Sequence, residues 1–345
     1  MPVHPIFGNW PYIVKDENIE SNIRSVYPRI SIITPSYNQG EFIEETILSI
    51  IHQGYPNIQF IVIDGGSTDK TVSIIKKYES YIDFWVSEKD NGQSDAINKG
   101  LLKADGDIIN WLCSDDILLP KSLHTIAHNF IDNPKINVVS GISRQFNEVD
   151  DFGLSATTMH QDISRLLYHS HICQPSTWFR KNVFDKITPL NIELHYTMDS
   201  EMWIRYILEY STDSILYVPS VLCGYRYHNN SKTVSQDIHF GTDKIGLIYS
   251  VLYIIKAPTF LLDFYNIFCK SYIHTKINKT ENISEQDMKR IIQYYVLKTI
   301  TFSKTKRNYL VFLKCSLYYI IHQKGMSFSE FINLLKQHIA PKFFK

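Results

Sequence analysis

Hydrophobic positions over the first 140 residues follow two alternating patterns. Short apolar runs rich in β-branched residues predict strands over 30–34, 58–63, 82–86, 107–113 and 137–140. Between these runs, apolar positions recur at helical spacing and predict helices over 41–53, 71–81, 93–104 and 120–131. This alternation is typical of an α/β fold with a mostly parallel sheet flanked by helices.

The alternation stops after residue 141. A polar stretch over 144–153 precedes a predicted helix at 161–169, a strand at 175–179, a helix at 198–210 and a strand at 215–227. From 241 onward the pattern predicts helices only, with breaks near 257–258, 276–284 and 324–326. We therefore divide the chain into a lead-in (1–28), an α/β domain (29–240, with halves 29–140 and 141–240) and a C-terminal helical region (241–345).

Charge is balanced over the whole chain but not along it. The 345 residues include 35 Lys and Arg and 35 Asp and Glu, a balance that predicts no nucleic-acid partner. Residues 270–345 hold 14 Lys and Arg against 4 Asp and Glu, a balance of +10, so the preceding residues carry −10. Two interpretations of this basic region stay open: a solvated helical surface, and a segment attracted to an anionic membrane surface.

The cysteines and the apolar runs indicate the cellular compartment in which the protein is expected. Five widely spaced cysteines without a C-x-x-C pair argue against a disulfide framework and a zinc ribbon, and indicate a reducing compartment. The N-terminus lacks the basic and apolar segments of a secretory signal. No uncharged apolar run approaches the ~20 residues that span a bilayer. We expect a cytoplasmic protein, soluble or peripheral on the inner face of the membrane.

Acidic residues follow two of the predicted strands. Asp64 ends the second strand, and Asp115 and Asp116 follow the fourth. With the loop 34–40 after the first strand, they should meet at one edge of a parallel sheet. Adjacent carboxylates are costly unless a cation neutralises them, and Mg²⁺ bound to a diphosphate suits such a pair. The alternative is that Asp115 and Asp116 only cap the next helix.

The sequence also excludes two nucleotide-binding classes. It has no G-x-G-x-x-G after the first strand and no G-x-x-x-x-G-K-[ST], which argues against a dinucleotide-dependent dehydrogenase and a P-loop NTPase. A sugar-phosphate nucleotidyltransferase is disfavoured because residues 34–40 contain no Lys or Arg.

Six stretches, in order over residues 29–235, resemble the family 2 inverting glycosyltransferases with the GT-A fold. The matching segments are Ile30–Gly40, Ile63–Thr71, Asp90–Gly100, Gly106–Asp116, Met198–Arg205 and Tyr225–His228. The resemblance implies a nucleotide-sugar-binding half at 29–140 and an acceptor half at 141–240.

The resemblance assigns the donor side of the site. It implies a wall for uracil and ribose from Thr34, Pro35, Ser36 and Tyr37. It further implies that Asp64 hydrogen-bonds the pyrimidine and that Asp95 lies in the segment closing over the donor. The family usually has a second aspartate after the first, where this chain has Gly65.

The same resemblance implies a metal site for Mn²⁺ or Mg²⁺. The Ser114-Asp115-Asp116 segment is similar to the D-x-D motif but lacks its first acid. The metal is then expected on Asp116, with Asp115 nearer the ribose or sugar. His228 resembles a histidine that reaches the metal or diphosphate in relatives, with a purely structural role as the alternative.

Asp199 aligns with the catalytic base of the family. Glu201 is the alternative, and the two point about 200° apart on a helix, so only one can face the cleft. A third interpretation makes Asp199 a first-turn acid that complements the helix dipole. As a base, the carboxylate deprotonates an acceptor hydroxyl, which attacks the anomeric carbon and inverts its configuration.

The acceptor side is expected to include Gln174, Trp178 and Glu201. The expected function is transfer of a sugar from a nucleotide-diphosphate sugar, UDP-linked, to a glycan or lipid-linked acceptor of a bacterial surface polysaccharide or glycoconjugate. The C-terminal helices are then either an interfacial membrane mount or a helical subdomain or dimer surface. The alternative function is a degenerate family member that binds a nucleotide sugar or a partner without turnover.

Overall fold

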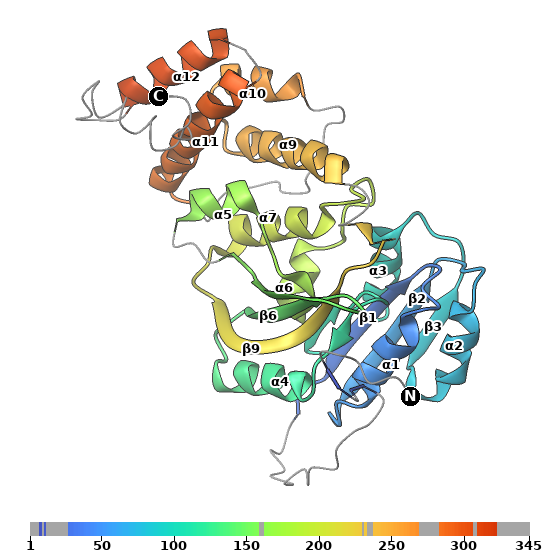
Figure 1. The fold of residues 1–345 in the computed structure, drawn as a ribbon. Helices are drawn as coiled ribbons and strands as arrows, with labels where there is room; N and C mark the ends of the chain where they lie inside the picture. Colours follow the sequence, from blue (N-terminus) through green and yellow to red (C-terminus); the bar gives the residue numbers. More distant parts are fainter. Residues whose placement is uncertain are drawn as a thin grey trace. The chain divides into compact units, whose positions relative to one another are not determined.

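The computed structural model describes residues 7–8, 10–11, 27–158, 162–229, 231–232, 237–268, 283–305 and 309–322. These residues fall into two compact units (Figure 1). The first lies within residues 1–159, 171–206 and 212–239, and the second within 160–170, 207–211 and 240–345. The expected division of the chain at residues 28, 140 and 240 stays a prediction.

The first part of the first unit is the parallel half of the sheet. Strands run in the order β3-β2-β1-β4, and each neighbouring pair is parallel. Their bounds are β1 Ile30–Ser36, β2 Ile58–Asp64, β3 Phe84–Ser87 and β4 Ile108–Trp111. All of β1 is buried, as expected for a central parallel strand covered on both faces.

Helices connect and cover these strands at the positions that the apolar spacing predicts. They are α1 (Ile43–Ile51), α2 (Thr71–Lys77), the short 3-10 helix η1 (Glu79–Tyr81), α3 (Gln93–Leu101) and α4 (Ser122–Asp132). Their buried faces join the strands in one core, which includes Ile43 and Ile47 of α1 and Ile126 and Phe130 of α4.

The rest of the sheet has mixed direction. Antiparallel β8 (Thr177–Arg180) joins β4 to β6 (Val138–Phe146), and the long curved β9 runs parallel to β6 (Figure 1). β9 spans Ile215–Arg226, and the two-residue β5 (Ile117–Leu118) pairs antiparallel with its far end. The remaining elements here are η2 (Gln174–Ser176), α6 (Lys181–Ile187) and α7 (Met198–Tyr210).

The polar stretch expected at 144–153 is in fact part of a hairpin. β6 continues to Phe146, and β7 (Asp151–Ala156) pairs antiparallel with it. β7 is an edge strand whose side chains are mostly exposed. Its sequence therefore lacks the hydrophobic alternation by which a strand is found, and backbone pairing with β6 defines it instead.

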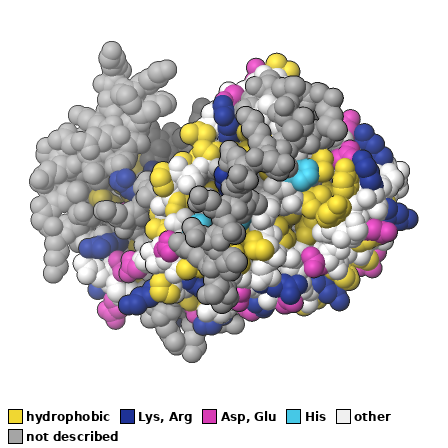
Figure 2. All heavy atoms as spheres, turned by 90° about the horizontal axis from the view of Figure 1, so that it is seen from below, with side chains coloured by type: hydrophobic (Ala, Val, Ile, Leu, Met, Phe, Trp, Pro, Cys, Tyr) yellow, Lys and Arg dark blue, Asp and Glu magenta, His cyan; other side chains and the backbone are white. Residues whose placement is uncertain are grey.

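Acidic and basic side chains are not segregated by sign on the face drawn in Figure 2. They are interspersed there, with apolar side chains between them. Surface ion pairs such as Lys77 with Glu44 (2.6 Å) and Lys99 with Glu88 (2.8 Å) occur in the first unit. Exposed pairs of this kind contribute little to the free energy of unfolding, so the buried core carries the stability of this unit.

The second unit is helical. It contains α5 (Ile163–His169) and most of α9 (Asp237–Ile254), with α10 (Thr259–Asn266), α11 (Glu285–Thr305) and α12 (Tyr309–His322). Its core includes Tyr265, which hydrogen-bonds Thr299 at 3.0 Å and stacks on Phe302. The predicted break at 257–258 falls between α9 and α10; the break at 324–326 lies outside the described residues.

Among the described residues, no helix combines the length and apolar character that crossing a bilayer requires.

Candidate active site

The ends of the parallel strands bring the predicted loops to one edge of the sheet. In register, Ser36 at the end of β1 pairs with Asp64 at the end of β2, and Asp64 pairs with Ser87 at the end of β3. The chain leaving β4 reaches Asp115 and Asp116 within five residues of Trp111. The expected convergence of these loops follows from the parallel register.

The two adjacent aspartates lie in different surroundings. Asp116 is 2% exposed, and its Oδ1 accepts a hydrogen bond from the backbone N–H of Arg226 at 2.9 Å. Burial and the neighbouring Asp115 raise the pKa of Asp116 well above its ordinary value. The Asp115 side chain is 18% exposed, and its Oδ2 lies 3.0 Å from Nε2 of His228. Asp115 and His228 therefore form the accessible part of the cluster.

Cys113 completes this cluster. Its Sγ and carboxylate oxygens of Asp115 and Asp116 all lie within 4.8 Å of one another. Burial raises the pKa of the Cys113 thiol well above its ordinary value, so the thiol is neutral at physiological pH. Cys113 directly precedes Ser114, the position where the D-x-D motif has its first acid, and the motif itself gives no sign that Cys113 belongs to the cluster.

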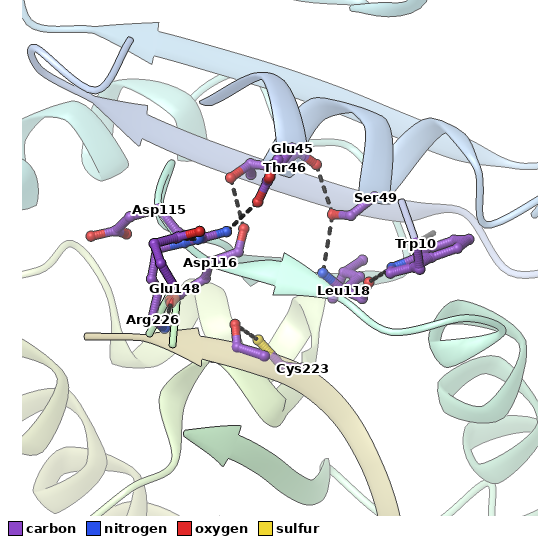
Figure 3. A network of polar contacts seen from close by, with 11 residues as sticks. Trp10, Glu45, Thr46, Ser49, Asp115, Asp116, Leu118, Glu148, Cys223 and Arg226 are labelled. Atoms are coloured by element: carbon purple, nitrogen blue, oxygen red, sulfur yellow. Dashed lines mark hydrogen bonds and ion pairs between the residues drawn. The ribbon is translucent and has the colours of Figure 1, made fainter. Parts of the chain in front are cut away.

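Arg226, at the end of β9, holds the Asp115-Asp116 turn in place (Figure 3). Its Nε donates to the backbone oxygen of Asp115 at 2.9 Å. The guanidinium is 1% exposed and forms ion pairs with Glu45 of α1 and Glu148. It also lies over the rings of Phe42 and Phe146, at 5.0 and 4.6 Å from their centroids. One buried cation thus joins α1, β9 and the turn.

A chain of hydrogen bonds supports the turn from its other side (Figure 3). Thr46 of α1 donates its hydroxyl to the backbone oxygen of Asp116 at 2.7 Å. Ser49 accepts from the N–H of Leu118 in β5 at 3.0 Å, and Trp10 donates to the Leu118 oxygen at 2.8 Å. Small hydroxyl side chains on the buried face of α1 therefore fix the backbone that presents Asp115.

Asp199 is partly exposed in the first turn of α7. Burial raises the pKa of its carboxyl to about 6, whereas hydrogen bonds from Ser200 and the charge of Lys232 oppose the shift. The backbone N–H of Ser200 donates to Asp199 Oδ1 at 2.7 Å. A carboxylate with a pKa near the working pH is suited to general-base catalysis.

Lys232 is the main residue that the sequence did not reveal. Its Nζ donates to Oε1 of Gln93 at 3.0 Å and to the backbone oxygen of His195 at 2.9 Å. Burial lowers the pKa of Lys232, and four groups oppose that shift by charge: Cys113, Asp199, Asp115 and Asp90. Gln93 in turn donates its amide to Cys113 Sγ at 3.1 Å, and His195 lies four residues before Asp199, so Lys232 links the loop of the acidic turn to the segment that leads into α7. Its only sequence signal is its position four residues after His228.

Asp90 lies where a second aspartate after Asp64 would project. A Cβ atom added to Gly65 would lie 2.7 Å from Asp90 Oδ2. The carboxylate is fixed by the backbone N–H of Gly92, which donates to Oδ1 at 2.8 Å. Gly65 thus leaves room for an acid from a different loop, which a linear motif does not show.

The carboxylate of Asp64 accepts hydrogen bonds from neighbouring groups of the protein. Gly66, at φ 81°, turns the chain back so that the N–H groups of Gly66 and Ser67 donate to Oδ2. The hydroxyls of Ser67 and Ser87 also donate to this carboxylate. Asp64 therefore joins the loops after β2 and β3, and its contact with a pyrimidine stays a prediction.

The other donor-side residues lie along the same edge. Thr34 and Ser36 are buried at the end of β1, and their hydroxyls have no hydrogen-bond partner among the described residues. Tyr37 is 60% exposed. Asp95 in α3 accepts from the N–H of Asn91 at 3.0 Å and lies 3.9 Å from Lys99.

The three expected acceptor residues are all buried. Trp178 is 0% exposed and belongs to the core of the first unit, so its place on the acceptor side stays a prediction. Glu201 is 1% exposed and pairs with Arg205 at 2.7 Å, which neutralises it inside α7. Gln174 donates to Asn110 and to the backbone oxygen of Trp111, both at 2.8 Å. Of the two candidate bases, Asp199 is the partly exposed one, and its role as the base stays a prediction.

Comparison with known proteins agrees with this geometry. The family profile described as "Glycosyl transferase family 2" matches residues 31–188. Uncharacterized glycosyltransferases of Rickettsia typhi and Rickettsia prowazekii are each 30% identical to this chain, over 60% and 61% of its length and 66% and 67% of theirs. The chain belongs to glycosyltransferase family 2.

Solved structures show the same fold. S. aureus TarS 1–349 in complex with UDP-GlcNAc superposes with a TM-score of 0.52 at 17% identity, covering 79% of this chain and 81% of that one. Mannosyltransferase PcManGT from Pyrobaculum calidifontis, in complex with GDP-Man and Mn²⁺, superposes with a TM-score of 0.51 at 16% identity. The match covers 92% of this chain and 89% of that one. These likenesses establish a GT-A-like fold with C-terminal helices, as expected from the sequence.

Replacing Arg226 by Met should lower the free energy of unfolding by about 3–5 kcal/mol, because it leaves Glu45 without its buried partner and frees the Asp115 turn. Replacing Arg144 by Gln is the matched control, since its pair with Asp151 lies at the surface and its loss should change the free energy of unfolding little. Urea unfolding of both variants measures the difference. Equal losses in the two variants would contradict the role given to Arg226.

Proposed function

We propose that this chain transfers a sugar from a nucleotide-diphosphate sugar, UDP-linked, to a hydroxyl of a glycan or lipid-linked acceptor, with inversion at the anomeric carbon. The observation that carries the proposal is that Lys232 bonds both Gln93, whose amide donates to Cys113 beside the acidic turn, and the backbone of His195, which leads into α7. We infer that Asp199, whose pKa is raised to about 6, and the acidic turn serve one site. Membership of glycosyltransferase family 2 supports the reaction class.

The residues suggest a direct displacement. Asp199 takes the proton of the acceptor hydroxyl as its oxygen bonds to the anomeric carbon. The bond from that carbon to the diphosphate oxygen breaks at the same time, and the electron pair leaves with the nucleotide diphosphate. Lys232 supplies positive charge where the leaving group develops negative charge. No covalent intermediate is required.

The acidic turn fits a divalent cation. Carboxylate oxygens and an imidazole nitrogen are suitable ligands for Mn²⁺, and Mg²⁺ suits the carboxylates and a diphosphate. Asp115 and His228 would hold the cation from the accessible side, with Asp116 beneath them. When bound, the cation would neutralise diphosphate charge and act as a Lewis acid on the leaving group.

The donor-binding part of the proposal keeps the expected residues at the ends of the strands: Thr34, Pro35, Ser36, Tyr37, Asp64, Asp95 and Asp115. TarS was solved with UDP-GlcNAc and PcManGT with GDP-Man, which together support a nucleotide-diphosphate sugar as donor; the choice of uridine follows from the sequence resemblance. We place the reaction in bacterial surface polysaccharide or glycoconjugate synthesis; a family relative of Staphylococcus epidermidis, 25% identical over 56% of this chain, is a poly-β-1,6-N-acetyl-D-glucosamine synthase. A cytoplasmic location, peripheral on the inner face of the membrane, belongs to the same proposal.

Replacing Asp199 by Asn should lower kcat by about 10²–10⁴-fold while donor binding is kept, because only the proton acceptor is lost.

In the unmodified chain, kcat/KM should fall as pH drops through about 6, since the base works only when deprotonated. Replacing Lys232 by Gln should move this limb to higher pH, because Lys232 lowers the pKa of Asp199. Replacing Lys181, which pairs with Asp185 instead, by Gln should leave the limb in place.

Steady-state kinetics across pH and calorimetric titration with UDP measure these effects. An Asp199→Asn variant that turns over normally would contradict the assigned base. If the unmodified chain binds donor without any turnover, the alternative of a binding protein without catalysis holds instead.

Replacing Asp115 by Asn, or His228 by Ala, should weaken Mn²⁺ binding about 10–100-fold, because each removes an accessible ligand. Replacing Asp105 by Asn, in a surface pair with Arg29, is the control and should leave binding unchanged. Electron paramagnetic resonance of free Mn²⁺ reports binding without reference to activity. Unchanged Mn²⁺ affinity in both cluster variants would exclude this cation site.

A further inference from the structure

Two lysines of the second unit lie at the ring of one tyrosine. The Nζ of Lys244 in α9 lies 5.9 Å from the ring centroid of Tyr168 in α5, and the Nζ of Lys298 in α11 lies 5.6 Å from it. Lys298 is also 5.2 Å from the ring centroid of Tyr294. Three helices thus bring two ammonium groups to one aromatic surface.

Arg165 in α5 adds a third positive charge. Burial is the main cause that lowers the pKa of both lysines, and charge repulsion adds to it: Lys298 acts on Lys244, and Arg165 acts on Lys298. Neither lysine forms an ion pair among the described residues. Asp162 lies 3.9 Å from Arg165, but it also caps α5 by accepting from the N–H of Ser164. The cluster therefore holds more positive than negative charge.

The surroundings make this excess charge costly. Tyr168 packs edge-to-face on Tyr294 and Tyr295, with ring centroids 5.7 and 5.3 Å away. The hydroxyl of Tyr295 is buried and has no hydrogen-bond partner among the described residues. Like charges that are partly withdrawn from water are unfavourable unless an anion joins them. Several convergent donors of positive charge suit a group with several anionic oxygens, which is the chemistry of a phosphoryl group.

We propose that Lys244, Lys298 and Arg165 bind a phosphoryl group. This inference does not depend on the proposed function. A phosphodiester of a soluble polymer and the phosphate of a lipid headgroup offer the same chemistry, and the experiment below distinguishes them.

Calorimetric titration of the full chain with inorganic phosphate, at constant ionic strength and with EDTA present, tests the site without the metal. The K244Q/K298Q variant should bind phosphate at least about tenfold more weakly, because two charged contacts are lost. The K289Q/K314Q variant carries the same change of charge on exposed lysines of α11 and α12 and should bind as the unmodified chain does. The K244R/K298R variant keeps the charges and should keep binding.

Phosphate affinity in K244Q/K298Q equal to that of the unmodified chain would overturn the proposal, as would an equal loss in K289Q/K314Q. Unfolding of K244Q/K298Q is not expected, because the change removes repelling charges; its thermal midpoint should match or exceed that of the unmodified chain.

The source of the phosphoryl group is tested with poly(glycerol phosphate) in solution and with phosphatidylcholine vesicles that contain phosphatidic acid. Binding to either probe that K244Q/K298Q loses supports the proposal and identifies the source of the phosphoryl group. Binding that this variant retains, or no binding to either probe, contradicts the proposal. Hydrolysis of the donor by water reports the transferase site separately, so phosphate binding without any donor turnover would overturn the proposed function and leave the phosphoryl site standing.

Discussion

The arrangement of the acidic turn depends on the burial of one guanidinium. Arg226 is almost inaccessible to solvent, and a charge in that position is tolerated only because Glu45 and Glu148 pair with it. The same side chain bonds the backbone of Asp115, and its own N–H bonds the carboxylate of Asp116. Arg226 therefore fixes the backbone of Asp115 and the carboxylate of Asp116. The carboxylate of Asp115 faces His228 instead.

This constraint links distant parts of the sequence. Glu45 belongs to the helix after the first strand, Asp115 follows the fourth strand, and Arg226 ends the last one. The parallel register of β1 to β4 brings the loops to one edge, and β9 returns the chain to that edge after the mixed half of the sheet. Asp199, the proposed base, begins α7, and Lys232 bonds the backbone of His195 just before that helix; its positive charge opposes the rise in the pKa of Asp199.

The parallel half of the fold could be predicted because each strand is an apolar run and each helix has a buried stripe. β7 could not, because an exposed edge strand is defined by its partner's backbone rather than by its own pattern. In the site, Asp115, Asp116 and Asp199 follow from motifs at element ends. Lys232 does not, because its role comes from a fold-back that places it beside residues far away in sequence. The burial of Trp178 could not be predicted either, since the sequence does not show whether an aromatic residue near an expected site belongs to the core.

The central claim is that the edge supported by Arg226 binds a nucleotide diphosphate together with a divalent cation. Thermal unfolding of the chain with UDP, GDP, CDP and dTDP, each with and without Mn²⁺, tests it most directly, since a ligand that binds only the folded state raises its stability. The account predicts that UDP with Mn²⁺ raises the unfolding midpoint and that the shift is lost without the metal. No shift with any nucleotide, with or without Mn²⁺, would contradict it.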